Sequence, residues 1–297
     1  MAAIEAHGLG KSFGGRPACR DVSFSVERGE VFGFLGPNGA GKTTTLRMLA
    51  GLFAPDAGTA RVAGCEIAPG RPGGPELRAR VGLLTEAPGF YDRLTARENL
   101  LHFAFLQRAR DPKRKTEALL ERFALGDHAD RPFAELSRGM KQKLAIARAL
   151  VHDPEVIFLD EPTVGLDPEA TREVRGVVAE LAAEHATIVL CTHHLEEVER
   201  LCSRAAFIAG RLVAIHEMRG QQMLRVDLAA PFQPDGVRPL CRSLRVEGVT
   251  LLIEPLAEVP EIVAALVGGG ARITRVVPHR DPLEDAWLQL LAEARER

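Results

Sequence analysis

One segment restricts what this chain can fold into more than any other: the apolar run Val31-Phe-Gly-Phe-Leu35 leads straight into Gly36-Pro-Asn-Gly-Ala-Gly-Lys-Thr-Thr44. A buried strand, a glycine loop and a helix in this order predict a phosphate-binding turn. The glycines leave room for backbone N–H groups to converge on phosphate oxygens, and a helix expected from about residue 43 to 49 would aim its positive end at them. The segment therefore predicts a binding site for a nucleoside triphosphate.

The polar residues of this segment have separate expected roles. Lys42 is long enough to reach the terminal phosphates, and the hydroxyl of Thr43 suits a Mg²⁺ ion that is bound with the nucleotide. The alternative is a glycine turn that holds no ligand. The residues expected to surround the nucleotide here are Gly36, Asn38, Gly39, Ala40, Gly41, Lys42, Thr43 and Thr44.

Two carboxylates and a histidine are predicted to join this site. The apolar residues 156–159 indicate a strand that delivers Asp160 and Glu161 at its carboxyl end, where open α/β sheets collect their ligands. Asp160 can hold Mg²⁺, and Glu161 can polarise the water that attacks the γ-phosphorus. A second predicted strand, at residues 188–190, ends close to His193, which we interpret as a γ-phosphate sensor rather than a structural histidine.

Composition places the chain among ordinary globular proteins: 297 residues, 46% hydrophobic and 26% charged, suit one large domain and a smaller one. The 38 basic and 40 acidic residues give a formal charge of -2, so we expect no nucleic-acid partner. The alternative that composition leaves open is a local basic patch. Five scattered cysteines without C-x-x-C spacing indicate reduced thiols of a cytosolic protein. Neither a targeting segment nor a bilayer-spanning run is recognisable, which predicts a chain that is soluble by itself.

Short β-type runs alternate with helical stretches through residues 1–215, which predicts an α/β fold with a largely parallel sheet. Several runs are apolar throughout, as in strands that are covered on both faces. Helices at residues 95–108, at 113–123 and after Ser137 form a predicted helical insertion over about residues 87–152. The predicted strands are residues 21–26, 31–35, 60–62, 80–84, 156–159, 187–191 and 205–208, and residues 68–75 are a predicted surface loop.

The pattern of predicted strands and helices changes beyond about residue 215. We therefore predict two domains, a larger one over residues 1–216 and a small α+β domain over residues 217–297. The smaller domain contains no motif that points to chemistry. Its predicted strands are residues 224–228, 244–246, 250–253 and 272–277, with helices near residues 261–266 and 283–294.

A further segment, Leu136-Ser-Arg-Gly-Met-Lys-Gln142, lies shortly before the acidic pair, and Gly165-Leu-Asp167 follows that pair. Together with the phosphate loop, these segments resemble the signature and the D-loop of the ATP-binding subunits of ABC transporters. His193 is similar to the switch histidine of the family. The resemblance covers about residues 4–215 and implies a P-loop NTPase core with an antiparallel β subdomain, with ATP and Mg²⁺ as cofactors.

The resemblance also implies a dimer. Ser137 stands where a helix N-cap would, so it forms a second anion-binding helix start, and one phosphate cannot face two such sites of one domain. In the family two domains pack head to tail, which implies that Ser137 and Gly139 act on the partner's nucleotide and that Asp167 belongs to the nucleotide site. The implied partners are an identical or related ATPase and an integral-membrane permease, on the cytoplasmic face of the cell membrane.

Some positions depart from the family pattern. Arg138 stands where the family usually has glycine and Met140 where it has glutamine, so Arg138 either adds positive charge near the phosphate or is simply solvated. Glu86 replaces the Q-loop glutamine beside the insertion that grips the membrane partner, where its carboxylate would face the metal or the attacking water. Phe13 matches the aromatic residue that stacks on adenine; the alternative is a core phenylalanine.

Residues 94–100 and 281–287 resemble the branch of the family whose permeases are of the ABC-2 export type. The leading hypothesis is therefore an ATPase subunit that drives a separate export permease. One alternative is a soluble ABC ATPase that acts on ribosomes, DNA or metal-cluster assembly, but the sequence shows no second cassette, coiled-coil insertion or zinc motif. The other is a non-catalytic nucleotide-binding regulator, which the presence of Lys42, Asp160, Glu161 and His193 disfavours.

Overall fold

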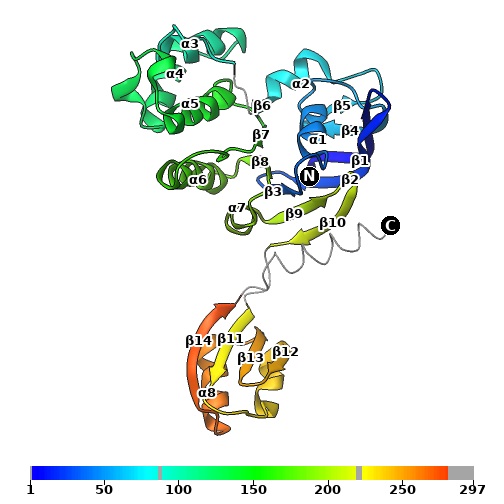
Figure 1. The fold of residues 1–297 in the computed structure, drawn as a ribbon, viewed down its shortest axis with the longest axis vertical. Helices are drawn as coiled ribbons and strands as arrows, with labels where there is room; N and C mark the ends of the chain where they lie inside the picture. The colour runs from blue at the N-terminus through cyan, green and yellow to red at the C-terminus, as the bar shows by residue number, and fades with distance from the viewer. Residues whose placement is uncertain (1, 86–88, 219–222, 280–297) are drawn as a thin grey trace. The chain divides into compact units, whose positions relative to one another are not determined.

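The computed structural model describes residues 2–85, 89–218 and 223–279. Among these residues the central element is a six-stranded sheet (Figure 1), in the order β10 (Leu212–Glu217), β9 (Arg204–Ile208), β3 (Val31–Leu35), β8 (Thr187–Thr192), β7 (Val156–Asp160) and β6 (Val81–Leu84). Neighbouring strands pair in parallel, apart from the antiparallel β10 and β9. The predicted α/β class with a mostly parallel sheet is confirmed.

A second, antiparallel sheet forms the β subdomain that the family resemblance implies. Its order is β2 (Arg16–Glu27), β1 (Ala2–Phe13), β4 (Ala57–Val62) and β5 (Cys65–Ile67). The long strand β1 was not predicted, because its pairing with β2 shifts register between Ala6 and Leu9 and again between Leu9 and Lys11. Such irregularities break the alternation of buried and exposed residues by which a strand is recognised.

The helices of the insertion begin at capping residues. Thr95 and Glu98 form a capping box at the start of the first helix, and the side chains of Asp111 and Ser137 cap the other two. Figure 1 shows these three helices gathered on one side of the parallel sheet, with the antiparallel sheet on the other side. The insertion helices are α3 (Ala96–Leu106), α4 (Pro112–Arg122) and α5 (Arg138–Leu150), and the others are α1 (Lys42–Leu49), α2 (Gly74–Arg80), α6 (Pro168–Ala183) and α7 (Leu195–Leu201).

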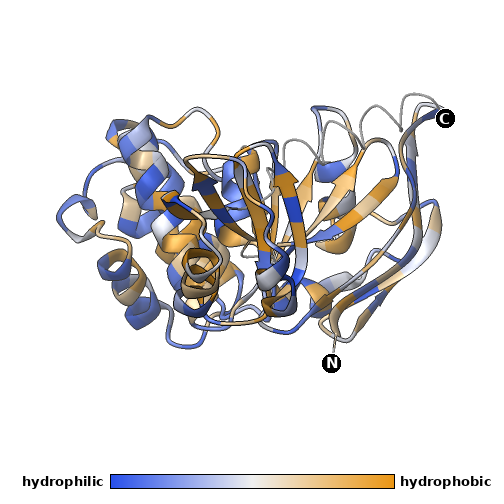
Figure 2. Cartoon of the chain, turned by 90° about the horizontal axis from the view of Figure 1, so that it is seen from below, coloured by the Kyte–Doolittle hydropathy of each residue, from blue (hydrophilic) through white to orange (hydrophobic). Residues whose placement is uncertain are grey.

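The buried core explains why the central strands are apolar. Every residue of β3, β7 and β8 is buried. Figure 2 shows several strands of the molecule largely in the orange of apolar residues. Phe24 packs on Phe32 and Phe34, with ring centroids 5.5 Å and 5.0 Å away. This dense packing fixes the carboxyl ends of β3, β7 and β8, from which the predicted site residues extend.

A glycine in β6 is a point where this packing leaves no room for a side chain. A β carbon at Gly82 would lie 2.2 Å from the carbonyl oxygen of Ala149, which is backbone and cannot rotate away. We expect Gly82→Ala to destabilise the fold by about 1–3 kcal/mol and to lower Tm, as measured by calorimetry, by about 2–4 °C per kcal/mol. The matched control is Gly176→Ala inside α6, where no described atom other than the local backbone of α6 lies within 4 Å of the added carbon, and it should keep or raise Tm. An unchanged Tm for Gly82→Ala would contradict this packing.

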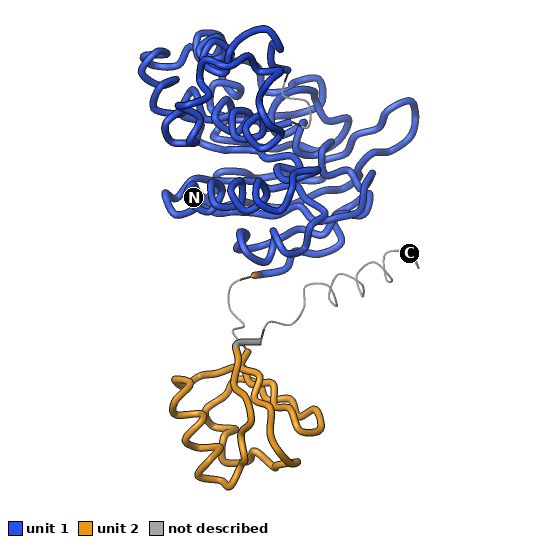
Figure 3. Tube along the Cα trace, turned by 60° about the vertical axis from the view of Figure 1, so that its left-hand side comes forward, with its two compact units in different colours: residues 1–217, 293–297 blue, residues 218–292 orange. Residues whose placement is uncertain are grey.

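The chain divides into two compact units between residues 217 and 218 (Figure 3). The second unit has an antiparallel sheet in the order β12 (Cys241–Glu247), β13 (Thr250–Pro255), β11 (Met223–Leu228) and β14 (Ile273–His279), with the helix α8 (Val259–Gly268). Its own core includes the fully buried Val226, Ile253 and Ile262. The helix predicted for residues 283–294 and the segment 281–287 lie outside the described residues.

Within residues 2–85, 89–218 and 223–279, no helix combines the length and the apolar content that crossing a bilayer requires.

Candidate functional site

The glycine loop between β3 and α1 is held by close backbone contacts. A β carbon at Gly36 would lie 2.2 Å from the carbonyl oxygen of Ile208, and one at Gly41 would lie 2.5 Å from that of Ala18. Gly41 also has a φ of 95°, a left-handed conformation that L side chains rarely adopt. Two independent constraints therefore require glycine at Gly41, and the loop is fixed at the carboxyl end of the strand.

Lys42 is buried in this loop, with 5% of its surface exposed. Its ammonium group donates to the carbonyl oxygen of Gly36 at 2.7 Å and to that of Pro37 at 3.2 Å, and lies 3.8 Å from Glu161 Oε1. An ammonium group has three N–H donors in total, and phosphate oxygens are stronger acceptors than these carbonyls. The geometry therefore places one preorganised positive charge at the mouth of the loop.

A pair of oxygen ligands lies beside this lysine. Thr43 Oγ1 donates to Asp160 Oδ1 at 2.9 Å. Burial raises the pKa of Asp160 above its usual value, and the hydrogen bond from Thr43 partly opposes that shift. Since burial disfavours the charged carboxylate, a divalent cation beside the two oxygens would favour it.

The two oxygens of Thr43 and Asp160 suit Mg²⁺ better than a metal ion whose ligands all come from the protein. Within the part of the chain that the structure describes, no group of three or more His, Cys, Asp or Glu side chains is arranged to hold a metal ion. Mg²⁺ characteristically takes one or two protein oxygens and completes its shell with water and substrate phosphates. Thr43 and Asp160 supply that number of oxygens.

Glu161 and His193 form the third part of the site. His193 Nδ1 lies 2.9 Å from Glu161 Oε2 and 3.0 Å from Oε1; because a carboxylate only accepts, Nδ1 is the donating nitrogen. Glu161 has a φ of 50°, in the left-handed region that non-glycine residues seldom occupy. Its N–H donates to the carbonyl oxygen of Cys191 at 2.8 Å, which anchors this conformation to β8.

Lys42, Thr43, Glu161 and His193 open into one cavity of about 530 Å³, while Asp160 contacts it through Thr43. The structure therefore brings together residues that are far apart in sequence and that the sequence assigns to one nucleotide site. It adds Ala18 and Val164, which carry no polar group and gave no sequence signal. The lining residues are Ala18, Asn38, Gly39, Ala40, Gly41, Lys42, Thr43, Thr44, Glu161, Val164 and His193.

Phe13 does not line this cavity, but it is no core residue either, because 52% of its surface is exposed. Its ring meets that of Phe53 edge to face, at 5.7 Å between centroids. Lys11 Nζ lies 5.9 Å and 5.6 Å from the two ring centroids and 2.6 Å from Asp56 Oδ1. An exposed, supported aromatic ring is suited to stacking on a planar base, and its neighbours Phe53 and Lys11 were missed by sequence reasoning.

The signature residues lie in a different cavity of about 380 Å³, which Ser137, Gly139 and Asp167 help to line. Asp167 caps α6, since its side chain accepts from the N–H groups of Glu169 and Ala170. A β carbon at Gly139 would lie 2.8 Å from that of Ala170, so glycine here permits close packing of α5 and α6. Within one chain, these three residues are therefore not brought to the Lys42 cavity.

Arg138 lies against the D-loop of its own chain. A β carbon at Gly165 would lie 2.2–2.8 Å from the Nη2, Cζ and Nη1 atoms of Arg138, so the guanidinium covers the face of this glycine. Gly165 has a φ of 68°. The structure therefore shows a specific neighbour for Arg138, which neither of the two roles inferred from the sequence includes. Glu86 lies outside the described residues.

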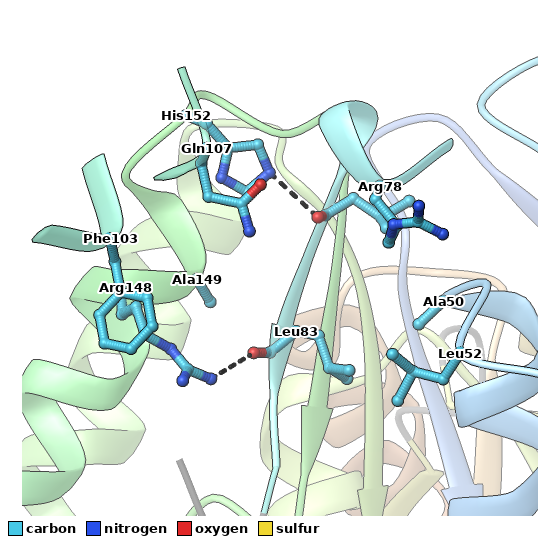
Figure 4. Close-up of a pocket in the computed structure, with 10 residues that line it drawn as sticks. Ala50, Leu52, Arg78, Leu83, Phe103, Gln107, Arg148, Ala149 and His152 are labelled. Atoms are coloured by element: carbon cyan, nitrogen blue, oxygen red, sulfur yellow. Dashed lines mark hydrogen bonds between the residues drawn. The ribbon is translucent and has the colours of Figure 1, made fainter. Parts of the chain in front are cut away.

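A groove of about 200 Å³ is lined by residues of β6, of the insertion and of the segments around α1 and α2 (Figure 4). Arg148 lies over the ring of Phe103, at 4.9 Å from its centroid, and donates to the carbonyl oxygen of Leu83 at 3.3 Å. His152 Nε2 lies 3.0 Å from the carbonyl oxygen of Val81. These contacts join the insertion to β6 and shape the groove.

Comparisons with known proteins agree with this architecture. Residues 19–164 match the ABC transporter family. The Nod factor export ATP-binding protein I of Paraburkholderia xenovorans is 43% identical over 261 residues, covering 84% of this chain and 85% of that relative. Its namesake from Rhizobium johnstonii is 36% identical and covers 99% of this chain and 96% of the relative.

A solved structure shares the fold of the larger unit. It is a dimeric ATP-binding cassette in a post-hydrolysis state with ADP and Pi, and it aligns with a TM-score of 0.66 at 24% sequence identity. The alignment covers 73% of this chain and 99% of that chain.

Proposed function

The chain belongs to the ABC transporter family of ATP-binding proteins, and from that premise we propose that it dimerises around MgATP and drives a separate membrane permease for export. ATP binding and ATPase activity come with the family. The direction of transport is supported by the two relatives, both of which are named as export ATP-binding proteins. One observation carries the assignment: a single cavity is lined by a buried lysine, by Thr43, which donates to Asp160, and by a carboxylate paired with histidine.

Each of these groups has a proposed role in hydrolysis. Lys42 and the loop amides hold the phosphates, while Thr43 and Asp160 hold Mg²⁺, which supplies charge stabilisation when it is bound. Glu161 accepts a proton from the attacking water, and His193 orients that carboxylate and contacts the γ-phosphate. Phe13 is proposed to stack on the adenine ring. Glu86 remains the proposed Q-loop residue, with its carboxylate facing the metal or the attacking water.

The dimer follows from the separation of the two cavities. Ser137 and Gly139 line a cavity apart from Lys42, so one chain cannot bring both helix starts to one γ-phosphate. A second chain, identical or related, can supply its own Ser137 and Gly139 head to tail and leave Asp167 at the boundary. ATP would then join the two subunits, and hydrolysis would release them.

The permease is proposed to dock at the insertion, over about residues 87–152, beside the groove of Figure 4. This places the subunit on the cytoplasmic face of the membrane, without nucleic acid as partner. We propose residues 1–216 as the ATPase domain and residues 217–297 as an accessory domain. The ABC-2 type of permease is supported by residues 94–100 and 281–287.

Affinity purification of the tagged chain from detergent-solubilised membranes tests the permease. We expect an integral-membrane protein to be recovered, and Leu52→Glu to reduce its recovery because Leu52 is 51% exposed and lines the groove. Leu256→Glu is the matched control, since Leu256 is an exposed leucine (61%) outside residues 87–152 that does not line the groove. Recovery of ribosomes or DNA, without a membrane protein, would overturn the permease proposal in favour of a soluble ABC ATPase.

A further inference from the structure

A carboxylate that the proposed reaction does not use lies fully buried beside the site. Glu197 of α7 has 0% of its surface exposed. Its Oε1 accepts a short hydrogen bond from Thr163 Oγ1 and lies 3.4 Å from Arg175 Nε. Its Oε2 has no hydrogen-bond partner in the described part of the chain. Burying a carboxylate is costly, so its retention here calls for a reason.

A gain in folding stability does not explain why the carboxylate of Glu197 is buried. A buried ion pair gains little over well-packed apolar side chains, since the Coulomb attraction mostly repays the cost of desolvation. Arg175 is shared with the exposed Glu196, whose Oε2 lies 3.0 Å from Arg175 Nη1, and Glu196 also pairs with Arg200 at 2.9 Å. What Glu197 does provide is a hydrogen-bond acceptor at a fixed position: its buried Oε1 holds the hydroxyl of Thr163.

The position of this cluster in the chain indicates what it fixes. Thr163 lies two residues after Glu161 in the loop that follows β7, and Glu197 lies four residues after His193 at the end of β8. The Thr163–Glu197 hydrogen bond therefore ties together the two segments that carry Glu161 and His193. Arg175 of α6 also contacts the carboxylate of Glu197, so a third segment of the chain joins this cluster.

We propose that Glu197 is a positioning residue for ATP hydrolysis: through Thr163 it sets the distance between Glu161 and His193. This inference rests on the proposed role of Glu161 as the base. Glu161 has a left-handed backbone that the loop must hold in place, and it keeps its carboxylate 2.9 Å from His193. Without the link, the loop after β7 keeps its backbone bond to Cys191 but loses the side-chain contact that fixes it to the segment leading from His193 into α7.

The test compares Thr163→Val, which has nearly the same shape but no hydroxyl, with Thr163→Ser, which keeps the hydroxyl. We expect Thr163→Val to lower kcat by about 10- to 100-fold, the loss typical of a small misplacement of catalytic groups. KM and the Kd for ATP should change little. Tm should fall in Thr163→Val because the buried Glu197 loses a hydrogen-bond donor, and Thr163→Ser should restore both Tm and kcat. Glu197→Gln, which keeps an acceptor oxygen for Thr163, should lose less activity than Glu197→Leu.

Glu196→Gln is the matched control, because it removes an exposed carboxylate from the same arginine and should leave kcat unchanged. The inference is overturned if Thr163→Val retains kcat, if Glu196→Gln lowers kcat equally, or if the loss appears in Kd and Tm without rescue by Thr163→Ser. Glu161→Gln, measured in parallel, separates the two claims. If Glu161→Gln retains turnover, the proposed base is wrong; if only Thr163→Val does, the positioning inference alone fails.

Discussion

Glu161→Gln is expected to lower kcat for ATP hydrolysis by about 10²- to 10⁴-fold, the contribution of a well-placed general base. The amide keeps the size of the side chain and an oxygen that can accept from His193 Nδ1, which lies 2.9 Å from the native carboxylate. It cannot take a proton from water. Phosphate release under saturating MgATP measures kcat, and light scattering should show a nucleotide-bound dimer that accumulates.

The control for this substitution is Glu180→Gln, which neutralises an exposed glutamate of α6 and should leave turnover as it is. The Kd for ATP should be unchanged in both variants. Turnover that survives in Glu161→Gln would show that another group activates the water. Loss of ATP affinity together with turnover would instead indicate a damaged loop.

Lys42→Ala should act on binding itself. A hydrogen bond to a charged group is worth about 1.5–3 kcal/mol, and each 1.4 kcal/mol is about tenfold in Kd, so ATP should bind about 10- to 150-fold more weakly. Isothermal titration with MgATP measures this shift. The removal also leaves the carbonyl oxygens of Gly36 and Pro37 without their donor, so Tm must be compared as well.

Lys113→Ala, at an exposed position of α4, is the corresponding control and should leave Kd unaltered. The contrast between the two site variants is informative. Lys42→Ala should lose affinity for ATP, whereas Glu161→Gln should keep affinity and lose turnover. An unchanged Kd in Lys42→Ala would show that the loop amides alone hold the phosphates.

The strands that position the site were predictable because they are covered on both faces. Every residue of β3, β7 and β8 is buried, so these strands appear in the sequence as continuous apolar runs. The helix α2 was not predicted, because it begins at Gly74-Pro75 inside a stretch rich in glycine and proline that suggests a loop. Proline is well tolerated in the first turn of a helix, where its missing N–H has no partner to lose.

The cavity was predictable for a related reason. Asp160 ends the buried strand β7, while Lys42, Glu161 and His193 follow buried strands, and parallel strands bring their carboxyl ends to one edge of the sheet. Contacts between side chains on different loops carry no such signal. Nothing in the spacing of Thr163 and Glu197, or of Arg138 and Gly165, indicates that they touch. These pairs depend on the angles at which α5, α6 and α7 leave the sheet.

The backbone of Glu161 has a consequence for engineering. A left-handed residue with a β carbon costs roughly 1–2 kcal/mol, and glycine or asparagine would relieve much of that cost. A screen that ranks variants of this chain by melting temperature alone is therefore expected to enrich Glu161→Gly and Glu161→Asn, which would melt at higher temperature but hydrolyse ATP far more slowly. Thermostabilisation of this subunit has to be scored on phosphate release and melting together.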